Sequence, residues 1–356
     1  MRRKGTKKIK VFSKGHKKRF CCDLHADFCG EKLKRGTRKD MSKVLTAIDK
    51  SGSYRVYLGM TTDLVEEARQ IHQTSPLATA GLGRVLTATV MMGLMLKNQG
   101  DKITVLFKGD GPAKQILATA DSQGHVKGFI ANPDIELPHT KEGKLDVGGS
   151  LGIGDLTVIK DLGLKDPYIG TIALVSGEIA DDLTAYYYIS EQQNTAISLG
   201  VKVDTDYSVL ASGGLFIQML PDAEEGAIDA LEKMLETLEP VSSLVEEATN
   251  KVREEHAAEE PLSEGFLEEK ILAAILSKIF GNMPEEYGVD PMEYREVSWQ
   301  CDCSMERLEK VLMTIGEKDL REIIEEDGKA ELVCQFCCKK YNFDKEHLEA
   351  ILESIL

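Results

Sequence analysis

Two pairs of cysteines near the C-terminus have the residue type and the spacing of a metal site. Cys301 and Cys303 are one residue apart, and Cys334 and Cys337, thirty residues further on, are two residues apart. Two pairs of thiolates that are brought together by the segment between them make a tetrahedral zinc site, with each sulfur about 2.3 Å from the metal. Unrelated buried cysteines would not be expected in two close pairs. The spacing therefore predicts one zinc ion as the cofactor, held by these four residues.

The two pairs differ in a way that suggests a switch. Cys-x-x-Cys is the usual zinc knuckle, whereas Cys-x-Cys is rarer, and a disulfide closed across it would be strained and labile. We therefore expect a site that both holds structure and responds to oxidation. Cys338 follows the second pair directly, at a position where the backbone often needs a permissive conformation. We predict that Cys338 is a spare thiol and not a ligand.

The composition indicates a folded protein of about two domains. The chain has 356 residues, of which 42% are hydrophobic and 29% are charged, as is ordinary for soluble globular proteins. The N-terminus lacks the apolar core of a secretory signal. Together with zinc-type cysteine spacing, this favours a reducing compartment, so we expect a cytoplasmic protein.

Charge is distributed unevenly along the chain. The net charge is −15, but residues 1–40 contain 15 Lys and Arg against 4 Asp and Glu, a balance of +11, which leaves −26 for residues 41–356. A nucleic-acid-binding zinc protein normally presents a basic face to phosphates. The acidic remainder of this chain argues against that function.

The basic extension, residues 1–40, has three interpretations: an organellar targeting arm, a nucleic-acid tail, or a start that precedes the native one. We favour the last, because Met41 begins a well-patterned domain. Cys21, Cys22, His25 and Cys29 have the residue types of a metal site, but no fold pattern surrounds them. The extension also has no periodic apolar face, so we expect it to be disordered or absent from the native product.

Residues 41–224 have the pattern of a mostly antiparallel α+β domain. A strand is predicted at 53–58, a helix follows up to His72, and short strands separated by turns extend to Met219. Leu77–Leu96 is long enough to span a membrane, but its Ala, Gly and Thr content favours a buried core helix. Gly148–Gly154 lacks the ending of a phosphate-binding loop and is predicted to be a loop between strands.

Residues 225–296 are predicted to form a helical, acidic linker. Residues 222–296 contain 21 Asp and Glu against 6 Lys and Arg. Residues 245–260 are nearly all polar, so we expect them to be loosely held. A broad apolar stripe follows on one helix, and it consists of Phe266, Leu267, Ile271, Leu272, Ile275, Leu276, Ile279 and Phe280. This stripe either docks permanently on the N-terminal domain or docks conditionally, so that the same face can also bind something else.

Residues 297–356 are predicted to form a small zinc domain. Ser304 and Asp344 each have the position of a helix N-cap, and Gly316 follows the first of these helices. About sixty residues with so few large apolar groups are marginally stable by themselves. A structural zinc contributes about 10–16 kcal/mol in small metal-dependent domains, so we expect the metal to decide whether this one folds.

From Met41 onwards, the chain resembles the 33 kDa redox-regulated chaperonins, a heat-shock family of ATP-independent holdases. The resemblance is carried by Lys160–Gly163, Ser176–Thr184, Gly213–Pro221, Cys301–Ser304, Ile324–Gly328 and Cys334–Cys337. Residues 1–40 have no counterpart at the usual start of the family. Cys338 also departs from the family pattern, which often has a small polar residue there.

The resemblance implies a stress-response protein that is not an enzyme. It places zinc on the four paired cysteines in the reduced, inactive form. Oxidation would then form the disulfides Cys301–Cys303 and Cys334–Cys337, release zinc, unfold the tail and linker, and expose a surface for unfolded clients. The apolar stripe between Phe266 and Phe280 is the predicted set of client-binding residues. The implied partners are aggregation-prone proteins, without ATP, nucleic acid or membrane, and the oxidised form is a candidate homodimer.

Two other classes of function compete with the holdase. A zinc-ribbon adaptor or nucleic-acid-binding protein would bind its partner equally well when reduced. A metabolic enzyme with an accessory zinc tail would need a pocket with perturbed titratable groups. The sequence contains no Gly-x-Ser-x-Gly elbow and no histidine beside a nucleophile in a recognisable motif.

Overall fold

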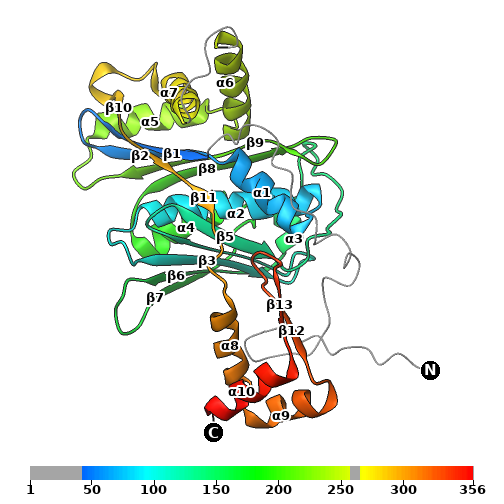
Figure 1. Cartoon of the computed structure of the whole chain (residues 1–356). Helices are drawn as coiled ribbons and strands as arrows, with labels where there is room; N and C mark the ends of the chain where they lie inside the picture. The colour runs from blue at the N-terminus through cyan, green and yellow to red at the C-terminus, as the bar shows by residue number, and fades with distance from the viewer. Residues whose placement is uncertain (1–41, 257–264, 356) are drawn as a thin grey trace. The chain divides into compact units, whose positions relative to one another are not determined.

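The computed structural model describes residues 42–256 and 265–355. These residues divide into two compact units: the body, residues 42–300, and the tail, residues 301–355 (Figure 1). The basic extension, including its Cys21–Cys29 cluster, lies outside the described residues. Residues 225–296, which were predicted to be a helical linker, belong to the same unit as residues 42–224, and so do residues 297–300, which were predicted to begin the zinc domain.

Sheet A, the first sheet of the body, has five strands and is antiparallel throughout. Its order is β10 (Val289–Glu296), β1 (Lys43–Asp49), β2 (Tyr54–Met60), β9 (Val209–Met219) and β8 (Thr195–Val203). The prediction that residues 225–296 are helical is wrong for the last residues of this range, which form β10. There, Val289–Glu296 hydrogen-bonds along β1, because an extended segment beside an edge strand satisfies its backbone groups by pairing.

Sheet B has six strands, all antiparallel except for one short parallel pair, β11 with β5. Its order is β11 (Ser298–Trp299), β5 (His125–Ile130), β4 (Gln115–Asp121), β3 (Lys102–Gly109), β6 (Gly154–Asp161) and β7 (Tyr168–Ala173). The predicted antiparallel α+β class is confirmed, and the pairing differs from the parallel sheet of a doubly wound fold.

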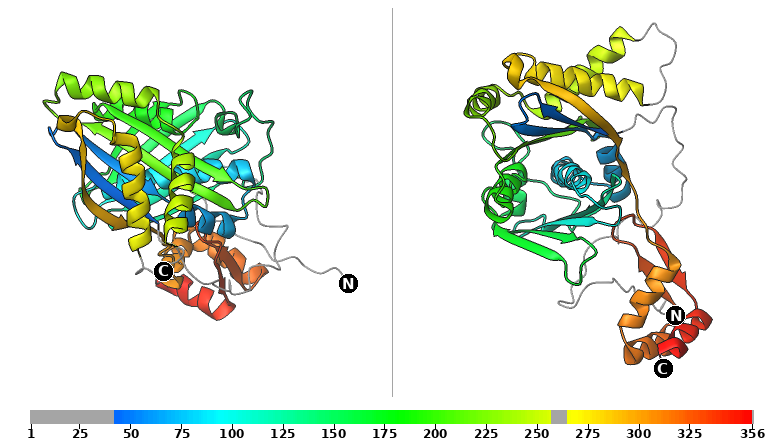
Figure 2. Two further views of the ribbon diagram at one scale, coloured as in Figure 1. Left: turned by 90° about the horizontal axis from the view of Figure 1, so that it is seen from above. Right: turned by 90° about the vertical axis from the view of Figure 1, so that its left-hand side faces the viewer.

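Helix α2 (Pro76–Leu94) lies between the two sheets and contacts strands of both, as the right-hand view of Figure 2 shows end-on. Among the described helices, α2 alone has the length and hydropathy of a membrane span, and 94% of that stretch is buried. A Cβ atom at Gly93 would lie 2.6 Å from the carbonyl oxygen of Asp121, so glycine permits this close packing. The predicted core helix is confirmed.

Shorter helices complete the layer between the sheets. They are α1 (Thr62–His72), α3 (Val147–Leu151), α4 (Ala180–Tyr186) and the π-helix η1 (Tyr187–Glu191). The predicted loop at Gly148–Gly154 is partly wrong, because α3 occupies its first half. Asp146 caps this helix by accepting a hydrogen bond from the backbone N–H of Gly149 (2.8 Å).

Three helices and a 3₁₀ turn cover the outer face of sheet A, the face turned away from α2 (Figures 1 and 2). They are α5 (Glu225–Glu236), α6 (Val241–Glu255), α7 (Phe266–Phe280) and η2 (Glu285–Tyr287). The prediction that residues 245–260 are loosely held is wrong for 245–255. Val245 and Val252 are buried on one side of α6, because a helix turns widely spaced apolar residues onto one face. Residues 257–260 lie outside the described part.

Sheet A therefore separates two apolar cores. On β1, Val44 packs into the core around α2, while the next residue, Leu45, packs under α5–α7. On β9, Phe216 faces α2 and Leu215 faces the covering helices. This alternation follows from the two-residue period of a strand, and it leaves sheet A apolar on both faces.

The tail combines three helices with a hairpin. The elements are α8 (Met305–Thr314), α9 (Glu317–Glu326), β12 (Ala330–Val333), β13 (Lys340–Phe343) and α10 (Lys345–Ile355). Both predicted N-caps are confirmed, since Ser304 Oγ accepts from Arg307 N–H (3.3 Å) and Asp344 Oδ1 accepts from His347 N–H (2.9 Å). The antiparallel hairpin β12–β13 was not predicted.

Candidate metal centre

The first cysteine pair lies in the extended segment that leads into α8. Cys301 and Cys303 directly precede Ser304, the N-cap of that helix. Arg307, one turn into α8, donates to the backbone carbonyl of Asp302 (3.2 Å) and forms an ion pair with its carboxylate. The capped start of α8 therefore fixes the direction of the segment that carries both sulfurs.

The second pair lies in the turn that joins β12 to β13. Cys334 N–H donates to Lys339 O (3.0 Å), and Cys338 N–H donates to Cys334 O (2.9 Å). Cys338 has φ +57°, in the left-handed region. The predicted need for a permissive conformation after the knuckle is thus confirmed.

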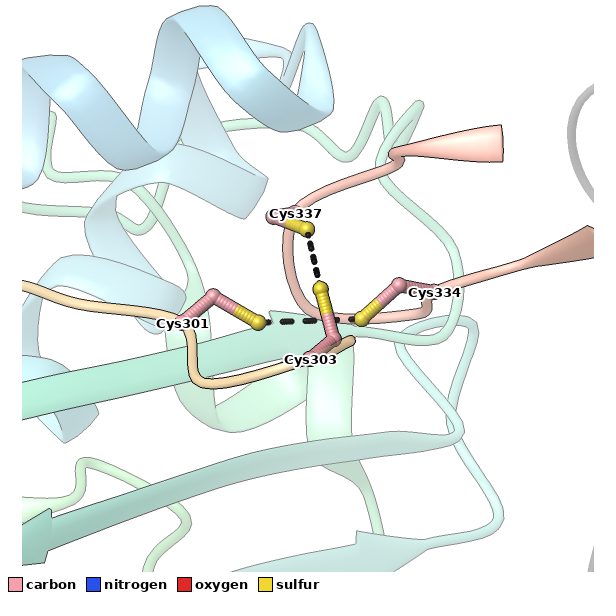
Figure 3. A group of neighbouring side chains, drawn as sticks. All are labelled: Cys301, Cys303, Cys334 and Cys337. Atoms are coloured by element: carbon pink, nitrogen blue, oxygen red, sulfur yellow. Dashed lines mark hydrogen bonds between the residues drawn. The ribbon is translucent and has the colours of Figure 1, made fainter. Parts of the chain in front are cut away.

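The four sulfurs form one cluster. Cys301 Sγ lies 3.7 Å from Cys334 Sγ, and Cys303 Sγ lies 3.3 Å from Cys337 Sγ (Figure 3). All four Sγ atoms lie within 4.8 Å of one another, and Cys338 does not belong to the group. Four sulfurs at about 2.3 Å from a central ion would lie about 3.8 Å apart. The cluster therefore has the size of a tetrahedral thiolate site, with sulfurs from the two pairs side by side.

The electrostatics of the cluster favour a bound cation. A hydrogen bond from the Cys337 side chain lowers the pKa of Cys334 to about 4. Burial raises the pKa of Cys301 to about 11, and the hydrogen bond with Cys334 raises the pKa of Cys337. Without a metal, the thiolate form is therefore favoured at Cys334 and disfavoured at Cys301 and Cys337. A divalent cation among the sulfurs would favour the thiolate form of all four.

The donor set also suits zinc in its chemistry. Soft thiolates in a tetrahedral S₄ arrangement are typical of structural zinc or iron–sulfur sites. Cys334 is buried and the other three are half-buried, all within the apolar core of the tail. A metal bound there would link the segment before α8 to the hairpin at the centre of that core.

The predicted client-binding residues all lie on α7. Most of them are buried against sheet A in the second core: Ile271, Leu272, Ile275, Leu276, Ile279 and Phe280. Leu267 is partly buried, and Phe266 is exposed. In this structure the stripe is therefore docked, which both interpretations of the sequence require.

The surface that α5, α6 and α7 cover together was not assigned by residue from the sequence. It is the outer face of sheet A, and its buried apolar residues are Leu45, Ala47, Tyr54, Val56, Leu58, Met60, Ala211, Leu215 and Ile217. A signal for it exists in the runs Val56–Leu58 and Leu215–Ile217, which are apolar without alternation. Strands that are buried on both faces have this pattern. Sheet B differs, since Ile103, Val105 and Phe107 alternate with half-exposed residues on β3.

Comparison with known proteins gives a consistent result. The sequence model described as "Hsp33 protein" matches residues 42–344. The 33 kDa chaperonin of Alkaliphilus metalliredigens (strain QYMF) is 45% identical over 317 residues, which cover 88% of this chain and 99% of that protein. The 33 kDa chaperonin of Clostridioides difficile (strain 630) is 43% identical over 315 residues, with 88% and 99% covered.

A solved structure has the same fold. The crystal structure of the 33 kDa chaperonin of Thermotoga maritima, a heat shock protein 33 homologue, superposes with a TM-score of 0.73 at 33% sequence identity. The match covers 89% of this chain and 99% of that one. The similarity therefore extends over both the body and the tail.

Proposed function

The chain belongs to the Hsp33 family, and we propose that it is a redox-regulated chaperone that holds unfolded proteins without ATP. Cys301, Cys303, Cys334 and Cys337 bind one zinc ion in the reduced, inactive state. The observation that carries this proposal is the group of four sulfurs within 4.8 Å of one another, at the core of a small unit. When bound, zinc supplies a crosslink that the apolar core of the tail is too small to replace.

The switch is a two-electron oxidation within each pair. Two thiolates, one peroxide molecule and two protons give one disulfide and two water molecules; the sulfurs are oxidised and the peroxide is reduced. The family resemblance implies the pairs Cys301–Cys303 and Cys334–Cys337, and each of these pairs stays close along the chain even when the tail loosens. Each disulfide removes two metal ligands together.

Loss of the metal is transmitted to the body through the chain itself. Only Gln300 separates Cys301 from β11, and Val297 joins β11 to β10. Strand β10 is the edge of sheet A and also contacts α7. Unfolding of the tail therefore frees the end of the segment that helps to hold α7, and local opening begins where stability is lowest.

Release of α5–α7 would uncover two apolar surfaces: the stripe on α7 and the outer face of sheet A. Contiguous apolar patches of this kind bind other proteins. The acidic linker, with 21 Asp and Glu against 6 Lys and Arg in residues 222–296, would keep the opened protein soluble. We propose unfolded proteins in the cytoplasm as partners, and self-association into a homodimer after oxidation.

The decisive experiment follows zinc release and aggregation suppression side by side during peroxide treatment. We expect the reduced protein to contain one zinc per chain and to suppress aggregation of a chemically unfolded test protein poorly. Suppression should rise as zinc is released, without ATP. A reduced protein that binds its partner equally well would instead favour the zinc-ribbon adaptor.

A further inference from the structure

Tyr341 connects the two halves of the metal centre through its hydroxyl group. The residue lies on β13 and is 5% exposed. Its Oη lies 3.1 Å from Cys303 Sγ and 3.0 Å from Cys303 O. A residue of the hairpin that carries the second cysteine pair therefore holds a cysteine of the first pair.

The sulfur of Cys303 has a donor from a side chain of the hairpin. Cys301 receives a backbone N–H hydrogen bond from Cys303, Cys334 receives two from Phe336 and Cys337, and Cys337 receives one from Lys339. Cys303 Sγ has the phenol of Tyr341 as a side-chain donor at 3.1 Å, beside the thiol of Cys337 at 3.3 Å. Backbone donors persist under any ordinary substitution, whereas the phenol donor depends on the identity of a single side chain.

The surroundings favour Tyr341 as a donor. Lys339 Nζ lies 5.0 Å from the centroid of the tyrosine ring, and a cation over an aromatic ring draws electron density from it. On β12, Leu332 pairs with Tyr341 in register, and both are buried. The ring is thus held in the buried core of the tail by its own hairpin.

We propose that Tyr341 is a positioning residue of the metal centre, whose hydroxyl holds the Cys303 thiolate in place and slows its reaction with oxidants. The inference rests on the zinc site proposed above. A hydrogen bond to a thiolate withdraws part of the charge that makes it nucleophilic. Partners of this kind around a metal typically change metal affinity 10–100-fold. Tyr341 would accordingly help to set how fast an oxidant triggers the switch.

The test is Tyr341→Phe, which removes the hydroxyl and keeps the ring. We expect zinc affinity, measured by competition with a chelator, to fall about 10–100-fold. Zinc release by hydrogen peroxide should be faster, and in the cobalt-substituted protein the thiolate-to-metal charge-transfer band should move to lower energy. Tyr54→Phe is the matched control. It removes a buried tyrosine hydroxyl that donates to Tyr287 O (2.7 Å) in the body, and it should change none of these values.

A second variant separates the hydroxyl from packing. Phe343 is buried on the same strand, two residues further on, and Phe343→Leu disturbs the core of the tail without removing a sulfur partner. If Phe343→Leu, at an equal loss of tail stability, reproduces the changes of Tyr341→Phe, packing explains them and the inference is wrong. Unchanged affinity, release rate and cobalt spectrum in Tyr341→Phe would also overturn it. Wild-type protein without bound zinc would instead contradict the proposed function itself.

Discussion

The body and the tail obtain their stability from different sources. In the body, α2 is buried between two sheets, and sheet A has a second apolar core on its other face. In the tail, one small core is built around residues such as Leu312, Leu320 and Leu348, and the four sulfurs form part of it. Apolar burial is insensitive to oxidants, whereas a thiolate site is not. A chain that joins the two can lose one unit while the other remains folded.

Removal of one metal ligand should have the largest effect, because it should unfold the tail and leave the body folded. Cys303→Ser or Cys334→Ser should abolish zinc binding and remove most of the roughly 10–16 kcal/mol that a structural zinc contributes. Hydrogen exchange should show loss of protection in residues 301–355, while residues 42–220 stay protected. A full zinc equivalent retained in both variants would contradict the assignment of the site.

Weakening the packing of α7 against sheet A should have the same effect on the body as the proposed oxidation of the tail. Leu272 lies on α7 and is completely buried against sheet A, and Leu272→Ala should cost about 2–5 kcal/mol. We expect aggregation suppression in the reduced protein, with zinc still bound.

The matched control for that variant is Leu82→Ala, which opens a cavity of the same kind in the core around α2. It should lower the stability of the body without uncovering the face under α7. If Leu272→Ala still needs oxidation for activity, the stripe is ordinary core and the client site lies elsewhere.

Acid should weaken the body through Glu66, which joins α1 to β9. Burial opposes ionisation of Glu66, but hydrogen bonds from Arg69, Gln70 and the Val209 N–H outweigh it and lower its pKa below 4.5. A lowered pKa in the folded state adds stability above pH 4.5, and that stability is lost as the pH falls through the folded value.

The partly exposed position of Glu66 limits the effect to about 1 kcal/mol. Glu66→Gln should reduce stability by that amount at pH 7 and flatten its dependence on pH below 4.5, as measured by urea denaturation. Glu136→Gln, at an exposed carboxylate, is the control. Equal pH profiles for wild type and Glu66→Gln would show that this contact contributes nothing.

Cys338→Asn should have a smaller effect, confined to the tail. Asparagine tolerates the left-handed conformation at φ +57° better than cysteine does, so a gain of less than about 1 kcal/mol is expected. Zinc should be retained, and disulfide mapping after peroxide should show fewer mismatched bonds to Cys337 or Cys334. Loss of zinc would identify Cys338 as a ligand.

Removal of residues 1–40 should have the smallest effect on zinc binding and on the response to oxidants. A protein that begins at Met41 is expected to keep its zinc and its response to oxidants, because the basic extension has no periodic apolar face. Zinc content and oxidant-dependent aggregation suppression would be compared with the full chain. Failure of the shorter protein to fold would show that the extension is part of the structure.

Local features of the chain were predictable because they depend on neighbouring residues. The four cysteines were found from their spacing alone, and the N-caps Ser304 and Asp344 from residue type and position. Helix α7 begins at Phe266 and ends at Phe280, at the limits of the predicted stripe. Helix periodicity and capping are short-range properties, so a single sequence contains enough information to determine them.

Only the tertiary structure determined the features that depend on contacts between residues far apart in the sequence. Strand β10 joins β1 across more than two hundred residues, and α6 is held by a few valines within a polar segment. The contact between Tyr341 and Cys303 exists only because the β12–β13 hairpin places a residue of its second strand beside the segment before α8. Strand pairing and sheet faces are fixed by partners far away in the chain, so the sequence alone specified the four sulfurs of the candidate metal centre, and the fold determined which apolar face of sheet A the helices α5–α7 cover.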